Sequence, residues 1–172
     1  MSHTCRLILV LAVVTPIAAQ AQKDVASCKP LLDASTRQNA TPYHLYMSIT
    51  QVPSDSKPQL GESISTGGAI YVLVDGKWQK SNMTPASMAQ QEQENIRNAS
   101  VYSCKPLREE SVGGVAAAVY SSHVESHDIK TDSQVWIAKS TGLVLRIDTD
   151  LETSHVAQRF EYTNVHPPAG VQ

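Results

Sequence analysis

The chain has 172 residues, of which 41% are hydrophobic, 17% are charged and 5% are aromatic, and its formal net charge at pH 7 is −2. A mildly acidic chain without a basic stripe lacks the electrostatic footprint of a nucleic-acid-binding protein, so the composition argues against such a partner. The aromatic content includes a single Phe. A core must therefore be built largely from Val, Ile, Leu, Ala and Tyr.

The N-terminus has the layout of a secretory signal peptide. Arg6 is the only charged residue before Lys23, residues 7–19 form an apolar run, and Ala19-Gln20-Ala21 supplies the small residues that a signal peptidase reads. The run is too short to span a bilayer comfortably, which disfavours the alternative of an N-terminal membrane anchor. We therefore predict a cleaved signal over residues 1–21, a periplasmic location and no transmembrane anchor after cleavage.

The mature chain, residues 22–172, is long enough for one domain with a hydrophobic core. Cleavage removes one Arg and no acidic residue, so the formal charge moves from −2 to −3. Near its start, Ser27 can cap a helix with Pro30 in the first turn, and this helix should fade by Asn39. Residues 42–50 then alternate between apolar and polar side chains, which indicates a half-buried strand.

The middle of the chain predicts short strands and one surface helix. Strands are expected over residues 61–66, 69–74 and 77–80, the last two joined by Asp75-Gly76, a strong hairpin signal. Thr84 is the predicted N-cap of the second helix, and Pro85 is its first residue. This helix is polar nearly all round, so it should lie at the surface and be held by few contacts.

From residue 101 onward the pattern is that of an antiparallel meander. The candidate strands are residues 101–108, 115–125, 130–139, 143–151 and 156–165. In the fourth of these, Leu143, Leu145 and Ile147 should share an apolar face, with Val144 and Arg146 on the other. The prediction is an α+β fold with two helices and about eight antiparallel strands, one side of whose sheet faces water.

The C-terminal third carries a family resemblance. Residues 134–150, QVWIAKSTGLVLRIDTD, contain a strand, a Thr-Gly-Leu turn and a second strand, and they are followed by RFEYTNV at 159–165 and by Pro167-Pro168. This stretch resembles the LolA-like superfamily of bacterial envelope proteins, the lipoprotein-carrier and lipid-binding half-barrels. The resemblance implies a curved antiparallel sheet whose concave face holds two helices and a hydrophobic ligand. It implies no catalytic residues and no cofactor.

Two interpretations of the cysteines remain open. Cys5 leaves with the signal, and the remaining pair, Cys28 and Cys104, would form a disulfide in an oxidising compartment. Alternatively, the residues Val25-Ala-Ser-Cys28 resemble a lipobox, which would make the protein a lipoprotein anchored at Cys28. Polar and charged residues separate this box from the apolar run, which favours the disulfide.

A metal site is a remote hypothesis. His123, Glu125 and His127 would share one face of a strand, and His155 could supply a further ligand. At about 3.3 Å per residue, however, His123 and His127 would lie roughly 13 Å apart, too far for one ion. A polar, solvent-facing strand end explains these residues more simply than a metal-dependent enzyme does.

The main functional hypothesis is a non-enzymatic periplasmic protein that binds a lipid or another hydrophobic molecule in its half-barrel. The candidate ligand-binding residues are the aromatic and aliphatic residues of the strand faces: Tyr43, Leu45, Met47, Ile49, Trp136, Leu143, Leu145, Ile147, Phe160 and Tyr162. The same residue types also build ordinary cores. The alternative is therefore a scaffold with a filled core that binds another protein of the cell envelope.

Overall fold

The computed structural model describes residues 23–53, 57–127 and 129–171; the predicted signal peptide at residues 1–21 lies outside these ranges. The described part contains two helices and nine strands. The helices are α1 (Lys29–Asn39) and α2 (Pro85–Asn98). The strands are β1 (Tyr43–Gln51), β2 (Gln59–Thr66), β3 (Ala69–Val74), β4 (Lys77–Lys80), β5 (Val101–Val112), β6 (Val115–Ser126), β7 (Ile129–Ala138), β8 (Val144–Asp150) and β9 (Ser154–Glu161).

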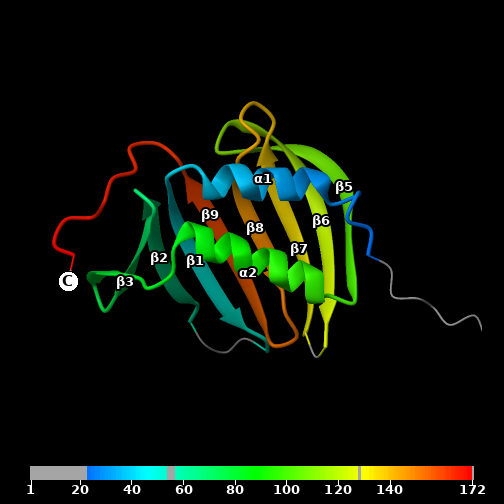
Figure 1. Ribbon diagram of the computed structural model, residues 1–172, viewed down its shortest axis with the longest axis horizontal. Helices are drawn as coiled ribbons and strands as arrows, with labels where there is room; N and C mark the ends of the chain where they lie inside the picture. Colours follow the sequence, from blue (N-terminus) through cyan, green and yellow to red (C-terminus); the bar gives the residue numbers. More distant parts are fainter. Residues whose placement is uncertain (1–22, 54–56, 128, 172) are drawn as a thin grey trace, which may run out of the picture.

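All nine strands form one open antiparallel sheet in the order β4-β3-β2-β1-β9-β8-β7-β6-β5. Two meanders, β1–β4 and β5–β9, are joined where β1 pairs with β9, with Leu45 opposite Phe160. Both helices lie across one face of the sheet (Figure 1). We call this the inner face and the opposite one the outer face. The predicted α+β class and antiparallel order are confirmed, with nine strands instead of about eight.

The topology explains why α2 covers the inner face. β4 and β5 form opposite edges of the sheet, so the segment between them must cross its full width. Helix α2 makes this crossing, running beside α1 in front of the central strands (Figure 1). The polar sequence of α2 fits this role, since none of its residues is fully buried.

The start of α2 is fixed by a capping box. The Ser87 backbone N–H donates to Thr84 Oγ1 at 3.1 Å, and the Thr84 backbone N–H donates to Ser87 Oγ at 2.9 Å. Pro85 follows as the first helical residue, where its missing N–H costs nothing. The predicted cap at Thr84 is therefore confirmed.

The start of α1 differs from the sequence prediction. Its N-cap is Cys28, which makes no side-chain capping bond. Ser27, the predicted cap, instead donates its hydroxyl to the Asp24 carbonyl at 2.8 Å and accepts a hydrogen bond from the Cys104 backbone N–H at 3.1 Å. The Ser27 cap was therefore wrong, because this hydroxyl holds the preceding turn against β5.

Cys28 and Cys104 form a disulfide, with their Cα atoms 4.9 Å apart. Both cysteines are buried in a small cluster with Ala99 and Tyr102. The bond ties the first turn of α1 to β5, at the edge of the sheet. A sulfur in this bond is not free for acylation, so the structure favours the predicted bridge over a lipid anchor at Cys28.

The two faces of the sheet carry separate apolar clusters. The inner cluster contains Ala34 of α1 and, from the sheet, Tyr43, Val135, Ile137, Val144 and Phe160. The outer cluster contains Ala117, Val119 and Trp136, with Val112 and Leu145 packed against it. Helices cover the first cluster, whereas polar and charged side chains surround the second.

A β-bulge decides which residues of β8 face inward. Trp136 pairs with Arg146 and Ile137 pairs with Val144, so Leu145 has no partner in β7. A bulge of this kind places one extra residue on a strand and interrupts its alternation. The predicted alternation is therefore wrong at Val144, which belongs to the inner cluster, and at Leu145, which packs on the outer face.

Candidate functional site

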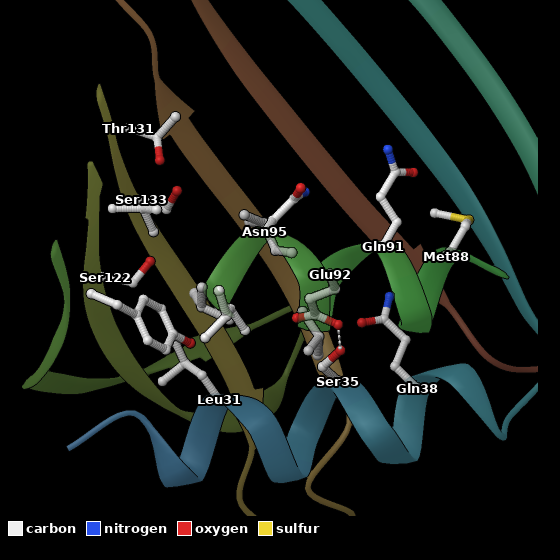
Figure 2. Close-up of a pocket in the computed structure, with 16 residues that line it drawn as sticks. Leu31, Ser35, Gln38, Met88, Gln91, Glu92, Asn95, Ser122, Thr131 and Ser133 are labelled. Carbon is white, nitrogen blue, oxygen red and sulfur yellow. Dashed lines mark hydrogen bonds between the residues drawn. The ribbon is translucent and has the colours of Figure 1, made fainter. Parts of the chain in front are cut away.

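A cavity of about 490 Å³ lies between the two helices and the inner face of the sheet. Figure 2 shows its residues converging from α1, α2 and the strands of the second meander. They are Leu31, Ser35, Gln38, Met88, Gln91, Glu92, Asn95, Ile96, Tyr102, Ser122, Val124, Thr131, Ser133, Val135, Val144 and Ile147. The volume falls within the range of roughly 300–1,000 Å³ that small-molecule sites occupy.

The apolar part of the cavity floor comes from three neighbouring strands. Val124 lies on β6, Val135 on β7, and Val144 and Ile147 on β8. Simple alternation brings Val124 and Val135 inward, because Val124 pairs with Thr131, which is four residues from Val135. Val144 and Ile147 both reach the cavity because of the bulge between them. Together these side chains offer an aliphatic surface for an apolar group.

Hydroxyl groups make the rest of the floor polar. Ser122 on β6 lies directly opposite Ser133 on β7, and Ser133 lies opposite Thr149 on β8. Ser133 and Thr149 share a hydrogen bond of 2.9 Å between their hydroxyl oxygens. Thr131, two residues before Ser133, also lines the cavity. The floor is therefore amphipathic.

The helices form a polar roof held together by one short hydrogen bond. Ser35 of α1 donates its hydroxyl to Glu92 Oε2 of α2 at 2.5 Å (Figure 2). Gln38 on α1 and Gln91 and Asn95 on α2 add amide groups beside this pair. The Ser35–Glu92 bond links the two helices above the floor.

The charge that lines the cavity is negative. Among the described residues that line it, Glu92 is the one carboxylate, and there is no Lys, Arg or His. Burial, and to a lesser extent the negative charge of Glu92, raises the pKa of Tyr102 to about 12. The Tyr102 phenol is therefore neutral at pH 7, and Glu92 dominates the local electrostatics.

The predicted ligand-binding residues divide between several places. Ile147 lines the cavity. Beside the cavity, the inner apolar cluster contains Tyr43 and Phe160, whose rings meet edge to face with centroids 5.5 Å apart, and Leu45 and Tyr162 pack against it. The Tyr162 hydroxyl donates to the Val144 carbonyl at 2.5 Å. These four residues belong to the inner cluster on the side of β1 and β9, and none of them lines the cavity.

The remaining candidates lie elsewhere. Met47 and Ile49 continue the inner face of β1 beyond Leu45, opposite Gln158 and Val156 of β9. Leu143 lies in the turn before β8. Trp136 and Leu145 pack in the outer cluster, away from the helices. Of the ten candidates, Ile147 is therefore the one that lines the cavity, and Trp136 and Leu145 lie on the opposite face of the sheet.

Sequence reasoning missed the polar half of the site. Ser35, Gln38, Gln91, Glu92 and Asn95 lie on helices whose packing against the sheet no strand pattern could reveal. One signal was available, because α1 and α2 both carry polar residues at i, i+3 and i+4 spacing, such as Gln91 and Asn95. Such a stripe is usually solvent-facing, so it did not suggest a site.

His123 and His155 belong to a polar row on the outer face, together with Asp132 and Asp150. His123 Nδ1 lies 2.7 Å from Asp132 Oδ1, and His155 Nδ1 lies 2.7 Å from Asp150 Oδ1. Asp132 and Asp150 are direct cross-strand neighbours. His127 belongs to the turn after β6, with a positive φ of 44°, so it does not share a strand face with His123 as predicted.

A second hollow, of about 830 Å³, lies beside this row and is lined mainly by charged and polar residues, among them Asp132 and Asp150. Within residues 23–53, 57–127 and 129–171, no group of three or more His, Cys, Asp or Glu side chains could hold a metal ion. Of the helices in the same ranges, none is long and apolar enough to cross a membrane. The inner-face cavity is taken as the candidate site because its lining combines aliphatic side chains from three strands with polar groups from both helices.

Comparison with known proteins identifies the fold but no sequence relative. No family model and no curated protein matches the sequence. The structure of LprF from Mycobacterium bovis is similar with a TM-score of 0.50 at 9% identity, over 87% of this chain and 99% of LprF. The structure of MucB is similar with a TM-score of 0.50 at 14% identity, over 88% of this chain and 64% of MucB.

A LolA superfamily protein from Nitrosomonas europaea also matches, with a TM-score of 0.28 at 10% identity, over 84% of this chain and 92% of that protein. At such low identities, structural likeness shows the fold alone. The two helices on an open antiparallel sheet, with the alignments to LprF and MucB, confirm the predicted LolA-like α+β fold.

Proposed function

We propose that this protein binds a hydrophobic or amphiphilic small molecule, without chemical conversion, in the cavity between its helices and the inner face of its sheet. The observation that carries the proposal is the cavity itself. Its 490 Å³ combine an aliphatic patch formed by Val124, Val135, Val144 and Ile147 with polar groups from both helices. A site with an apolar body and a few convergent polar groups is typical of small-molecule binding.

The driving force would be burial of the apolar part of the ligand. Transfer of each methylene from water into an apolar surrounding contributes about 0.8 kcal/mol. The hydroxyl groups of Ser122 and Ser133 and the amides of the roof would hydrogen-bond the polar part, so that it is not buried without partners. Binding would therefore orient an amphiphile as well as hold it.

The proposed location is the bacterial periplasm. A disulfide between two buried cysteines supports an oxidising compartment, in which such bonds persist. The layout of residues 1–21 supports export through a cleaved signal. N-terminal sequencing of the exported protein should begin near Gln22, and an acylated Cys28 would contradict both this cleavage and the disulfide.

Native mass spectrometry of protein released gently from the periplasm tests the proposal. We expect a fraction of the protein to carry one small hydrophobic molecule, which organic solvent extracts. Wild-type protein should also bind a neutral fluorescent probe such as Nile red. An apo mass together with no binding of Nile red would contradict ligand binding and would favour the alternative of a scaffold for an envelope protein.

A matched pair of variants locates the binding site. Ser122 lines the cavity, whereas its neighbour Ser121 lies on the outer face by strand alternation. Ser122→Phe should fill the cavity and weaken binding of Nile red by about tenfold or more, which corresponds to about 1.4 kcal/mol. Ser121→Phe adds the same side chain on the other face and should leave binding unchanged.

A further inference from the structure

The charge distribution around the cavity specifies the head group of the ligand. We infer that the cavity selects a single-chain amphiphile whose head is cationic, or neutral and hydrogen-bond-donating, and that it discriminates against anionic heads such as the carboxylate of a fatty acid. This inference rests on the proposed function, because it concerns the same cavity. It adds the chemical class of ligand that the cavity accepts.

The first step of the argument is the position of Glu92. Its side chain lines the cavity roof and accepts the Ser35 hydroxyl through Oε2 at 2.5 Å (Figure 2). An ionised carboxylate offers about four acceptor sites, of which this bond uses one. An ammonium or hydroxyl head has protons to donate to the others, whereas a deprotonated carboxylate has none.

The second step is the lack of compensating charge around Glu92 in the part of the chain that the structure describes. The cations on the two helices are Lys29, Arg37 and Arg97, and none of them lines the cavity. Lys29 is already paired with Asp33, 2.7 Å away on the exposed side of α1. An anionic head would therefore meet the Glu92 carboxylate without a neutralising partner.

The third step is the polarity of the other residues in the floor and roof of the cavity. Ser122, Thr131 and Ser133 can donate or accept, and the amides of Gln91 and Asn95 can do both. These groups suit a neutral head, but they carry no net charge that could hold an anion against Glu92. Charge interactions are stronger in a partly desolvated cleft than in water, so the sign of the head decides between otherwise equal ligands.

Three probes of equal chain length test the inference: dodecylamine, dodecanol and dodecanoate. Their dissociation constants are measured on wild-type protein at pH 7 and low ionic strength, by displacement of Nile red. We expect dodecylamine to bind about tenfold or more tightly than dodecanoate, with dodecanol between them. Because salt screens charges, the ratio should shrink at high ionic strength.

Variants of α2 identify the group responsible. Glu92→Gln keeps the shape and an acceptor for Ser35 but removes the charge, so the preference for dodecylamine should fall to about twofold or less. Glu94→Gln is the matched control, because Glu94 lies on the same helix, bonds Gln90 at 2.9 Å and does not line the cavity. It should keep the wild-type preference. Gln91→Lys, which adds a cation to the roof, should shift the preference toward dodecanoate.

The outcomes separate this inference from the proposed function. If all three probes bind wild-type protein with equal affinity, or if dodecanoate binds best, the head-group selectivity is wrong while ligand binding stands. If Glu92→Gln folds and keeps the full preference for dodecylamine, Glu92 is not its source and the inference is overturned. If none of the probes and no Nile red binds, the proposed function itself fails.

Discussion

Val144 and Ile147 line the same cavity although three positions separate them on one strand. In regular β structure, residues three apart point to opposite faces. The bulge at Leu145 explains why Val144 and Ile147 nevertheless share a face: Arg146 pairs with Trp136 while Val144 pairs with Ile137, so Leu145 is an extra residue between them. One extra residue thus places two aliphatic side chains on the cavity floor and turns Leu145 toward the outer cluster.

Two arginine side chains cover the ring of a buried tryptophan on the outer face. Trp136 is 3% exposed, and the guanidinium carbons of Arg146 and Arg108 lie 4.7 and 5.7 Å from its ring centroid. We predict that Arg146→Ala exposes the ring and lowers the free energy of unfolding by about 1 kcal/mol. In a Trp78→Phe background, Trp136 emission should shift to the red.

The control for this prediction is Arg159→Ala. Arg159 lies directly opposite Arg146 in β9 and covers the ring of Tyr46 at 4.4 Å, not that of Trp136. The charge change is the same, so Trp136 emission should stay at its wild-type wavelength. Equal red shifts in both variants would mean that Arg146 does not shield the ring.

The disulfide should contribute a large part of the stability. Cys28 and Cys104 are 76 positions apart, and closing a loop of this length is worth about 4 kcal/mol in the chain-entropy model. We predict that replacing both cysteines by Ala lowers the free energy of unfolding by about 2–4 kcal/mol. Guanidinium chloride denaturation measures this, with reduced wild-type protein as the control. An unchanged midpoint would show that the bond does not constrain the unfolded chain.

The cap of α2 should set how firmly the roof of the cavity is held. No residue of α2 is fully buried, so the Thr84 capping box and the Ser35–Glu92 bond are among the specific contacts that hold this helix. We predict that Thr84→Ala lowers the free energy of unfolding by about 1 kcal/mol, because the Ser87 N–H loses its acceptor. Thr84→Ser keeps the hydroxyl and should be close to wild type. Equal stabilities of the two variants would contradict the capping role.

His123 should titrate above its usual range. The hydrogen bond to Asp132 raises the pKa of His123, and Glu125, itself paired with Lys130, adds to the effect. Because the pKa of His123 is higher in the folded state, its protonated ring stabilises the fold fully at pH values below the unfolded-state pKa of about 6.5. This stabilisation is lost as the pH rises through the folded-state pKa.

An NMR titration of the His123 ring protons measures this directly. In Asp132→Asn the charge and the strongest acceptor are lost, so the His123 pKa should fall toward its usual value. Lys139→Gln, a change in an ion pair with Glu109, is the control and should not move it. A His123 pKa that is the same in wild type and Asp132→Asn would contradict the role of this pair.

The order of the elements could be predicted because each depends on local chemistry. Asp75-Gly76 supplies positive φ angles of 50° and 74°, which the hairpin between β3 and β4 requires. Thr84 and Pro85 mark the start of α2 for equally local reasons. The pairing of Cys28 with Cys104 followed from the predicted oxidising compartment and from there being no other cysteine in residues 22–172.

The cavity could not be predicted from strand alternation, because it depends on packing between distant elements. Alternation assigned Leu145 to the ligand side, but a bulge leaves no mark in a single sequence. Ser35 and Glu92 are 57 positions apart, and nothing in the sequence indicates that they meet. The polar roof of the cavity could therefore not be predicted from the sequence alone.

The central claim is that a ligand occupies the inner-face cavity, and methyl NMR with dodecylamine tests it most directly. We predict chemical-shift changes and intermolecular nuclear Overhauser effects at Val124, Val135, Val144 and Ile147 on titration of wild-type protein. The methyl groups of Val119 and Leu145, on the outer face, are internal controls and should not respond. Effects confined to these two, or no effects at any of the six, would contradict ligand binding in the cavity.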